Sequence, residues 1–205
     1  MRTAEGCCAV CGKTLVADER ALGTAAPVCH GCRTRRPSFA LARSAAVFQG
    51  PVRDLVHQLK YRHGIRLAEP LSELLHGCFL AHCSAERPDL VCPVPLHLSR
   101  LRQRGYNQSE ELARRLGRRL GLPCARRLLV RTRDTPTQTR MNAEERRANV
   151  AGAFRVPDRA VPCAYGKCVV LVDDVMTTGA TFEAAAAALR AAGAQRVLCL
   201  SVARD

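Results

Sequence analysis

The sequence predicts an α/β protein with a mainly parallel central sheet and a small cysteine-rich module at its N-terminus. From residue 89 onward, apolar segments of strand length alternate with segments of helical periodicity, which is the pattern of βαβ units. The segment Val169–Val172 is apolar on both faces, as a buried central strand of a parallel sheet must be. Two C-x-x-C pairs lie within the first 36 residues, ahead of the first expected strand.

The individual elements follow from apolar spacing and from the positions of glycine and proline. Strands are expected at residues 44–48, 89–93, 128–130, 153–156, 168–172 and 196–203, and helices at residues 52–62, 65–82, 107–120 and 179–192. In the third helix Leu112, Leu116 and Leu120 share one face, and Gly121 ends it. The polar segment 131–149 is long for a simple connection, so we expect either a functional lid or a disordered segment.

Charge and hydropathy narrow the classes of partner and compartment. The 205 residues carry a formal net charge of +14, and 29 of the 32 basic residues are Arg. Residues 97–147 hold 14 Arg against five acidic residues, which favours a polyphosphate or nucleic-acid partner, although compositional bias and solvated helix faces explain part of this excess. No apolar run reaches the ~18–20 residues that cross a bilayer, and the first residues lack the apolar core of a signal peptide. We therefore expect a cytoplasmic protein without membrane insertion.

The two C-x-x-C pairs predict a structural zinc site. Its four thiolates would come from Cys8, Cys11, Cys29 and Cys32. The 17 residues between the pairs fall in the usual range, and four thiolates leave no open position for catalysis. Cys7 and His30 are neighbouring competitors for a ligand position, and unliganded thiols or a redox pair are the other interpretations. Because metal binding would stabilise a segment too short to fold alone, we place a zinc-binding module at residues 1–36 and a second domain at residues 37–205.

A second signal follows the strand expected at 168–172. Asp173 and Asp174 end that strand, and the Thr- and Gly-rich turn Met176–Thr181 leads into a helix. Ligands of open parallel sheets bind at the carboxyl ends of the strands, and the N–H groups at a helix start favour an anion. The carboxylates can accept hydrogen bonds from vicinal ribose hydroxyls while the turn holds a 5′-phosphate; the alternative is an ordinary strand end before a capped helix. Neither G-x-G-x-x-G nor G-x-x-x-x-G-K-[ST] occurs in the chain, which argues against dinucleotide and P-loop sites.

The segment Val169–Thr181 resembles the signature of type I phosphoribosyltransferases, which use 5-phosphoribosyl 1-pyrophosphate (PRPP). The resemblance implies that Asp173 and Asp174 hold the ribose diol. It also implies a 5′-phosphate site at Met176, Thr177, Thr178, Gly179, Ala180 and Thr181. Purine-salvage members often carry an Asp in this loop as a general base. Thr177 stands at the equivalent position, and its hydroxyl group cannot act as a general base at neutral pH. Base-assisted transfer to a purine is therefore not expected.

Basic residues after the strand at 89–93 suit a pyrophosphate leaving group, because arginine donates paired hydrogen bonds to phosphate. In type I enzymes the turn after the first core strand has this role. The resemblance therefore implies PRPP binding by Pro95, Arg100, Asn107 and Gln108, and a catalytic role for Arg104 beside Asp173 and Asp174. The polar segment resembles the flexible lid that closes over PRPP, and a mobile surface loop is the alternative. Its lid residues would be Gln138, Arg146 and Asn149.

Taken together, several stretches resemble ComF-type proteins from about residue 7 to residue 203. They are Lys60-Tyr61, Pro-Val-Pro-Leu-His at 93–97, Arg-Gly-Tyr-Asn-Gln at 104–108, the spacing Gln138…Arg146…Asn149, the Asp-Asp…Thr-Thr-Gly signature and the C-x-x-C pairs. The resemblance implies a protein of bacterial competence and DNA uptake that transfers ribose 5-phosphate from PRPP, with Mg²⁺, to an acceptor that these residues do not reveal. The alternative is a non-catalytic module that binds PRPP or a nucleotide and contacts single-stranded DNA and a helicase partner.

Overall fold

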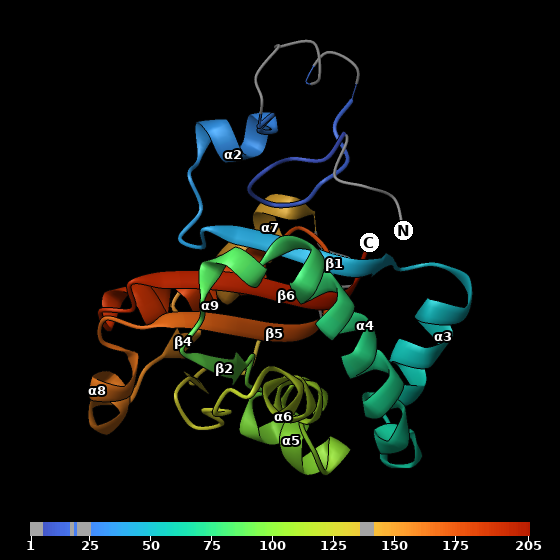
Figure 1. Cartoon of the computed structure of the whole chain (residues 1–205). Coiled ribbons are helices and arrows are strands. Elements are labelled where there is room, and N and C mark those ends of the chain that lie inside the picture. Colours follow the sequence, from blue (N-terminus) through green and yellow to red (C-terminus); the bar gives the residue numbers. More distant parts are fainter. Residues whose placement is uncertain (1–5, 17–18, 20–25, 136–141) are drawn as a thin grey trace.

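A parallel sheet of four strands forms the centre of the molecule (Figure 1). The computed structural model describes residues 6–16, 19, 26–135 and 142–205. The strands of this sheet are β1 (Leu41–Val47), β2 (Leu90–Pro93), β5 (Cys168–Met176) and β6 (Arg196–Arg204). Their order is β1-β6-β5-β2, and each neighbouring pair is parallel. The predicted α/β fold with a mainly parallel sheet is confirmed.

Strand β5 lies inside the sheet between β6 and β2, and its side chains alternate between two apolar cores. Val169 and Leu171 face one core, Val170 and Val172 face the other, and all four are fully buried. Burial on both faces explains why this segment is apolar without alternation. The strand continues to Met176, beyond its predicted end, so the two aspartates that follow Val172 belong to the strand itself.

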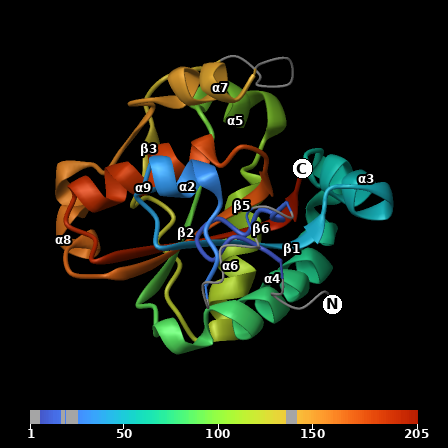
Figure 2. The same ribbon diagram turned by 90° about the horizontal axis from the view of Figure 1, so that it is seen from above.

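Helices cover both faces of the sheet (Figure 2). Helices α4 (Ala68–His82) and α6 (Gln108–Leu120) pack on one face, and α9 (Ala180–Ala191) packs on the other. In α6, Leu112 and Leu116 are fully buried, as their spacing predicted. Helix α3 (Gly50–Leu59) contacts β6 at the end of the sheet where the parallel strands finish.

Shorter elements connect this framework. They are α2 (His30–Thr34), η1 (Arg62–Leu67), η2 (Ser84–Glu86), α5 (Leu98–Arg104), α7 (Ala143–Val150), η4 (Asp158–Ala160) and α8 (Val161–Ala164). The four α-helices among them, α2, α5, α7 and α8, were not predicted, and two of them begin with a side-chain cap. Helix α5 is capped by His97, whose Nδ1 accepts from the N–H of Ser99, and histidine is not among the residues that usually mark a helix start. Helix α7 lies in the polar segment and begins with a capping box between Asn142 and Glu145.

The strands predicted at 128–130 and 153–156 do not join the parallel sheet. They are replaced by β3 (Val130–Arg131) and β4 (Phe154–Arg155), which pair antiparallel in a separate two-stranded sheet. Leu128 and Leu129 are buried in the core, so the apolar run that predicted a strand belongs largely to a buried loop. A continuous apolar run alone does not distinguish these two cases.

The N-terminal cysteines are part of the main core. Cys8, Leu15 and Cys29 are buried in the same apolar cluster as Val197 and Cys199 of β6. The described N-terminal segment therefore packs on one face of the sheet, with α2 above β1 (Figure 1). In the described part of the chain, no helix is long and apolar enough to span a membrane.

Candidate functional site

A cavity of about 410 Å³ opens at the carboxyl ends of β2 and β5. Most of the residues that the sequence assigned to PRPP line it: Asp173, Asp174, Met176, Thr177, Gly179, Ala180, Thr181, Pro95, Arg100, Arg104, Gln108 and Arg146. Segments far apart in the chain thus meet in one place. Asn107, Thr178 and Asn149 are not among its lining residues, and Gln138 lies outside the described residues.

The two aspartates form the polar floor of this cavity and are almost fully buried. Ser109 Oγ donates to Asp173 Oδ1 at 2.7 Å, and Gln108 Nε2 donates to Asp174 Oδ2 at 3.2 Å. Burial raises the pKa of Asp173 above its ordinary value, and the negative charge of Asp174 raises it further. A carboxyl pair in which one member is biased toward its neutral form can both donate and accept hydrogen bonds, which suits a diol.

Arginines from α5 and β3 enter the same cavity and bond to neutral oxygens. Arg104 Nη1 donates to Gln108 Oε1 at 2.5 Å, and Arg100 Nη2 donates to the carbonyl oxygen of Thr135 at 2.6 Å. Arg131 Nη2 donates to the hydroxyl of the same Thr135. Because these acceptors carry no charge, the guanidinium charges remain available to an anion in the cavity.

Arg131 is the clearest functional candidate that the site assignment from sequence missed. Its guanidinium carbon lies 5.4 Å from the centre of the Phe154 ring, and its Nε is buried without a hydrogen-bond partner, the one such side-chain atom among the described residues. Burial and the nearby positive charge of Arg100 lower its pKa. Because Arg131 also lines the cavity, its guanidinium is placed where it could bind an anion. Its position directly after an apolar run was the available signal.

Phe48 after β1, His57 of α3 and Lys60 directly after α3 also line the cavity, and the sequence assigned no site residue there. Lys60 Nζ lies 3.8 Å from Asp174 Oδ2. Tyr106 donates from its hydroxyl to the carbonyl oxygen of Tyr61 at 2.7 Å and also bonds to that of Leu59, so it fixes the backbone on both sides of Lys60. In the sequence, Lys60-Tyr61 contributes only to the family resemblance. Its position after a predicted helix carries no chemical signal that would place Lys60 beside Asp174.

The backbone conformation of the turn after β5 brings the start of α9 to the cavity. Gly179 has φ of 81°, and a Cβ atom there would lie 2.8 Å from Met176 Cε, so only glycine fits without displacement. Thr178 Oγ1 accepts from the N–H of Ala180 at 3.4 Å at the start of α9. The turn therefore presents the N-terminus of α9 to the cavity, where the helix dipole favours an anion.

Asn107 has a structural position rather than a place in the cavity wall. Its Oδ1 accepts from the N–H of Ser109 and caps α6, and its Nδ2 donates to the carbonyl oxygen of Val94 at 3.0 Å. Both polar atoms are thus engaged within the protein. Its contribution is to hold α6 against the turn that follows β2, which places the neighbouring Gln108 in the cavity.

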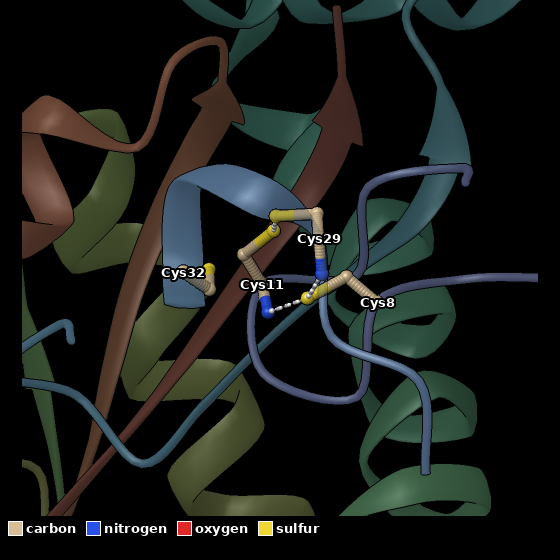
Figure 3. Close-up of side chains that lie close together, drawn as sticks. All are labelled: Cys8, Cys11, Cys29 and Cys32. Carbon is tan, nitrogen blue, oxygen red and sulfur yellow. Dashed lines mark hydrogen bonds between the residues drawn. The ribbon is translucent and has the colours of Figure 1, made fainter. Parts of the chain in front are cut away.

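A second candidate site lies in the N-terminal segment, where four cysteine side chains surround one point (Figure 3). The sulfur atoms of Cys8, Cys11, Cys29 and Cys32 all lie within 4.8 Å of one another. The Sγ atoms of Cys11 and Cys29 are 3.8 Å apart, which is the edge of a tetrahedron with metal–sulfur bonds of about 2.3 Å. These four cysteines could hold a zinc ion.

The electrostatics of the cysteine site also suit a cation. Burial would raise the pKa of Cys8, but the backbone N–H groups of Cys11 and Cys29 donate to its sulfur and lower the pKa to about 7. Burial raises the pKa of Cys11 to about 11. A divalent cation would stabilise all four thiolates together.

Comparison with known proteins identifies the family of the chain. Residues 101–205 match the phosphoribosyl transferase domain. Competence protein F of Haemophilus influenzae is 31% identical over 182 residues, covering 86% of this chain and 78% of that protein. The DNA utilization protein YhgH of Escherichia coli K12 is 36% identical over 180 residues, covering 84% of this chain and 76% of that one.

Among solved structures, the glutamine PRPP amidotransferase of B. subtilis, complexed with ADP and GMP, is similar with a TM-score of 0.46 and 23% identity, over 71% of this chain and 30% of that one. The chain belongs to the ComF family, together with Competence protein F and YhgH, and carries a phosphoribosyl transferase domain.

Proposed function

We propose that the cavity binds PRPP and that the protein transfers ribose 5-phosphate from it to an acceptor. The observation that carries this proposal is the meeting, in one cavity, of a buried aspartate pair with arginines whose hydrogen-bond partners are neutral. An anion alone would not require the aspartates, and a neutral sugar alone would not require the arginines. A sugar that carries phosphate groups requires both.

In this reaction the acceptor forms a bond to the anomeric carbon of ribose while the bond from that carbon to pyrophosphate breaks. The electron pair of the broken bond leaves with pyrophosphate, where Arg100, Arg104 and Arg131 would stabilise the developing negative charge. Asp173 and Asp174 would hold the ribose hydroxyls close to the positive charge that develops on the sugar ring. Mg²⁺ would add charge neutralisation on the diphosphate.

The acceptor is constrained by what the turn lacks. Thr177 lines the cavity where purine-salvage enzymes often carry a carboxylate, and a threonine hydroxyl does not accept a proton at neutral pH. We therefore propose an acceptor that is nucleophilic without base assistance from this turn. Arg146 of α7 lines the cavity and would act with Asn149 as part of a lid that excludes water from the reacting sugar.

Two measurements on the same preparation test this proposal. Calorimetric titration with PRPP and Mg²⁺ measures binding, and a pyrophosphate-release assay with nucleobases, amines and single-stranded DNA as acceptors measures transfer. Binding with acceptor-dependent release of pyrophosphate supports the enzyme. Binding without release from any acceptor class supports the non-catalytic alternative, and absence of binding contradicts both.

We also propose that the cysteine site holds one structural Zn²⁺, within a module at residues 1–36 that precedes the domain at residues 37–205. The four sulfur atoms around one point support it. Elemental analysis should give about one zinc per chain, since four thiolates fill a tetrahedral site. In Cys29→Ser/Cys32→Ser the zinc should be lost, and full occupancy in that variant would contradict the assignment. None of the 12 cysteines is joined in a disulfide, which supports our proposal of a cytoplasmic protein.

Contact with DNA is a second candidate function, which the name of the DNA utilization protein YhgH favours. We extend this proposal to single-stranded DNA and a helicase partner. Electrostatic binding of a single strand would show a slope near −0.7 in log K against log salt for each phosphate neutralised. A titration with a labelled oligonucleotide at several salt concentrations measures that slope. A flat response, or a contact surface confined to the cysteine module, would contradict this function for the basic residues at 97–147.

A further inference from the structure

The end of β6 lies between the cysteine site and the PRPP cavity, and one side chain there contacts both. Arg204 Nη1 donates to the carbonyl oxygen of Cys11 at 2.7 Å and to the sulfur atom of Met176 at 3.5 Å. A guanidinium Nη carries two N–H groups, so it can make both bonds at once. Cys11 is one of the four cysteines of the candidate zinc site, and Met176 lines the cavity.

Met176 is held at the start of the turn that faces the proposed 5′-phosphate. It is buried, and it pairs in register with Arg204 across β5 and β6. Its carbonyl oxygen accepts from the N–H of Asp205 at 3.1 Å. Its methyl group fills the space beside Gly179, where a Cβ atom would lie only 2.8 Å away. Because these atoms are in close contact, a shift of Met176 would displace the turn at Gly179.

The cysteine loop has a second anchor that does not touch the cavity. Arg43 of β1 donates from Nη2 to the carbonyl oxygen of Ala9 at 2.9 Å and from Nη1 to that of Val10 at 3.3 Å. Arg43 is not among the residues that line the cavity. Arg43 and Arg204 thus hold the same loop through the same kind of bond, but only Arg204 continues to the turn.

We propose that Arg204 is a positioning residue that couples metal occupancy of the cysteine site to ligand binding at the turn after β5. The inference rests on the proposed function, since it takes PRPP as the ligand of that turn. The residues fit a zinc ion, which would fix the Cys11 backbone and with it the acceptor of Arg204. The guanidinium is then held where it supports Met176, and Met176 supports the turn. Because coupling between two binding sites is reciprocal, PRPP must in turn tighten zinc retention.

Zinc affinity with and without PRPP measures this coupling. The protein is titrated to equilibrium against a chromogenic chelator with and without saturating PRPP, and the ratio of the two zinc dissociation constants is compared in wild type, Arg204→Gln and Arg43→Gln. PRPP is expected to lower the zinc dissociation constant about fivefold in wild type and in Arg43→Gln, the lower end of usual coupling factors, and to leave it unchanged in Arg204→Gln. Arg43→Gln alone should bind zinc more weakly at baseline, because one anchor of the loop is lost. If Arg204→Gln fails to fold, Arg204→Met replaces it, with the same loss expected because the thioether has no N–H group to donate.

A second readout separates this inference from the proposed function. Amide hydrogen exchange over Thr177–Ala180 in the zinc-loaded proteins, without PRPP, should rise in Arg204→Gln and remain at the wild-type level in Arg43→Gln. If PRPP fails to bind wild type, the proposed function is wrong. The hydrogen-exchange comparison then tests by itself whether Arg204 positions the turn. Wild-type exchange in Arg204→Gln, or PRPP that binds wild type without raising its affinity for zinc, would overturn the coupling.

Discussion

The arginines of α6 and the arginines of the cavity come from the same basic stretch of the chain, but their partners differ. On α6, Arg115 pairs with Glu111 and with Glu69, and Arg119 pairs with Glu69 at 2.7 Å. In the cavity, Arg100 and Arg131 bond to the carbonyl and hydroxyl groups of Thr135. Arg115 and Arg119 are ion-paired with carboxylates, whereas the hydrogen bonds of Arg100 and Arg131 go to neutral oxygens.

This difference shows that a charge count does not locate a binding surface. The excess of arginine over residues 97–147 was counted within the segment, and Glu69 of α4 lies outside it. A helical period could show that Glu111 and Arg115 are neighbours, but not that α4 packs beside α6. Part of the basic surplus therefore stabilises the packing of α6, and Arg100, Arg104 and Arg131 are arginines of this stretch that line the cavity.

The largest expected effect is on PRPP affinity, in variants of the two aspartates that share the cavity with the arginines. In the Asp173→Asn/Asp174→Asn variant the affinity for PRPP with Mg²⁺ should fall at least tenfold, since loss of a charged hydrogen-bonding partner costs roughly 1.5–3 kcal/mol each. The variant should melt near the wild-type temperature, because asparagine keeps the shape and the oxygen acceptors for Ser109 and Gln108. Unchanged affinity with a sharply lower melting temperature would make the aspartates structural.

On α6 the expected effect is on stability instead. Arg115→Gln breaks a largely buried ion pair with Glu111 and a second one with Glu69, and should lower the free energy of unfolding by about 1 kcal/mol. PRPP affinity should stay at the wild-type value. Denaturant unfolding and calorimetry on the same protein measure the two quantities. A fall in affinity without a loss of stability would reverse the roles assigned to the two groups of arginines.

A smaller effect is expected in the pH dependence of stability. The pKa of Asp173 is raised in the folded protein above its unfolded value of about 3.9. The native state therefore holds this proton more tightly, so its contribution is full below the unfolded pKa and is lost as pH rises through the folded pKa. Asp173→Asn should gain stability relative to wild type as pH rises from about 4 to about 7. Parallel unfolding free energies of the two proteins over that range would contradict the assignment.

Sequence reasoning was most successful where a residue pattern reports on one element. The apolar run in β5, the spacing of α6 and the paired cysteines each carry their own signal, and the parallel sheet and the cysteine cluster follow from them. It was weakest where a role depends on packing between elements. Lys60 reaches Asp174 from α3, and the position of Arg131 depends on a local antiparallel pair that an apolar run does not specify. Arg204 meets both Cys11 and Met176 only in the folded chain.

The most direct test of the account is a pair of variants that remove the same charge from the two groups of arginines. Calorimetric titration with PRPP and Mg²⁺ is carried out on Arg131→Gln and Arg119→Gln beside wild type. Because Arg131 carries a buried unpaired Nε in the cavity and Arg119 is paired with Glu69, affinity should fall about tenfold to hundredfold in the first and stay unchanged in the second. Equal affinities in the two variants, whether both reduced or both at the wild-type value, would contradict the claim that the cavity arginines hold PRPP.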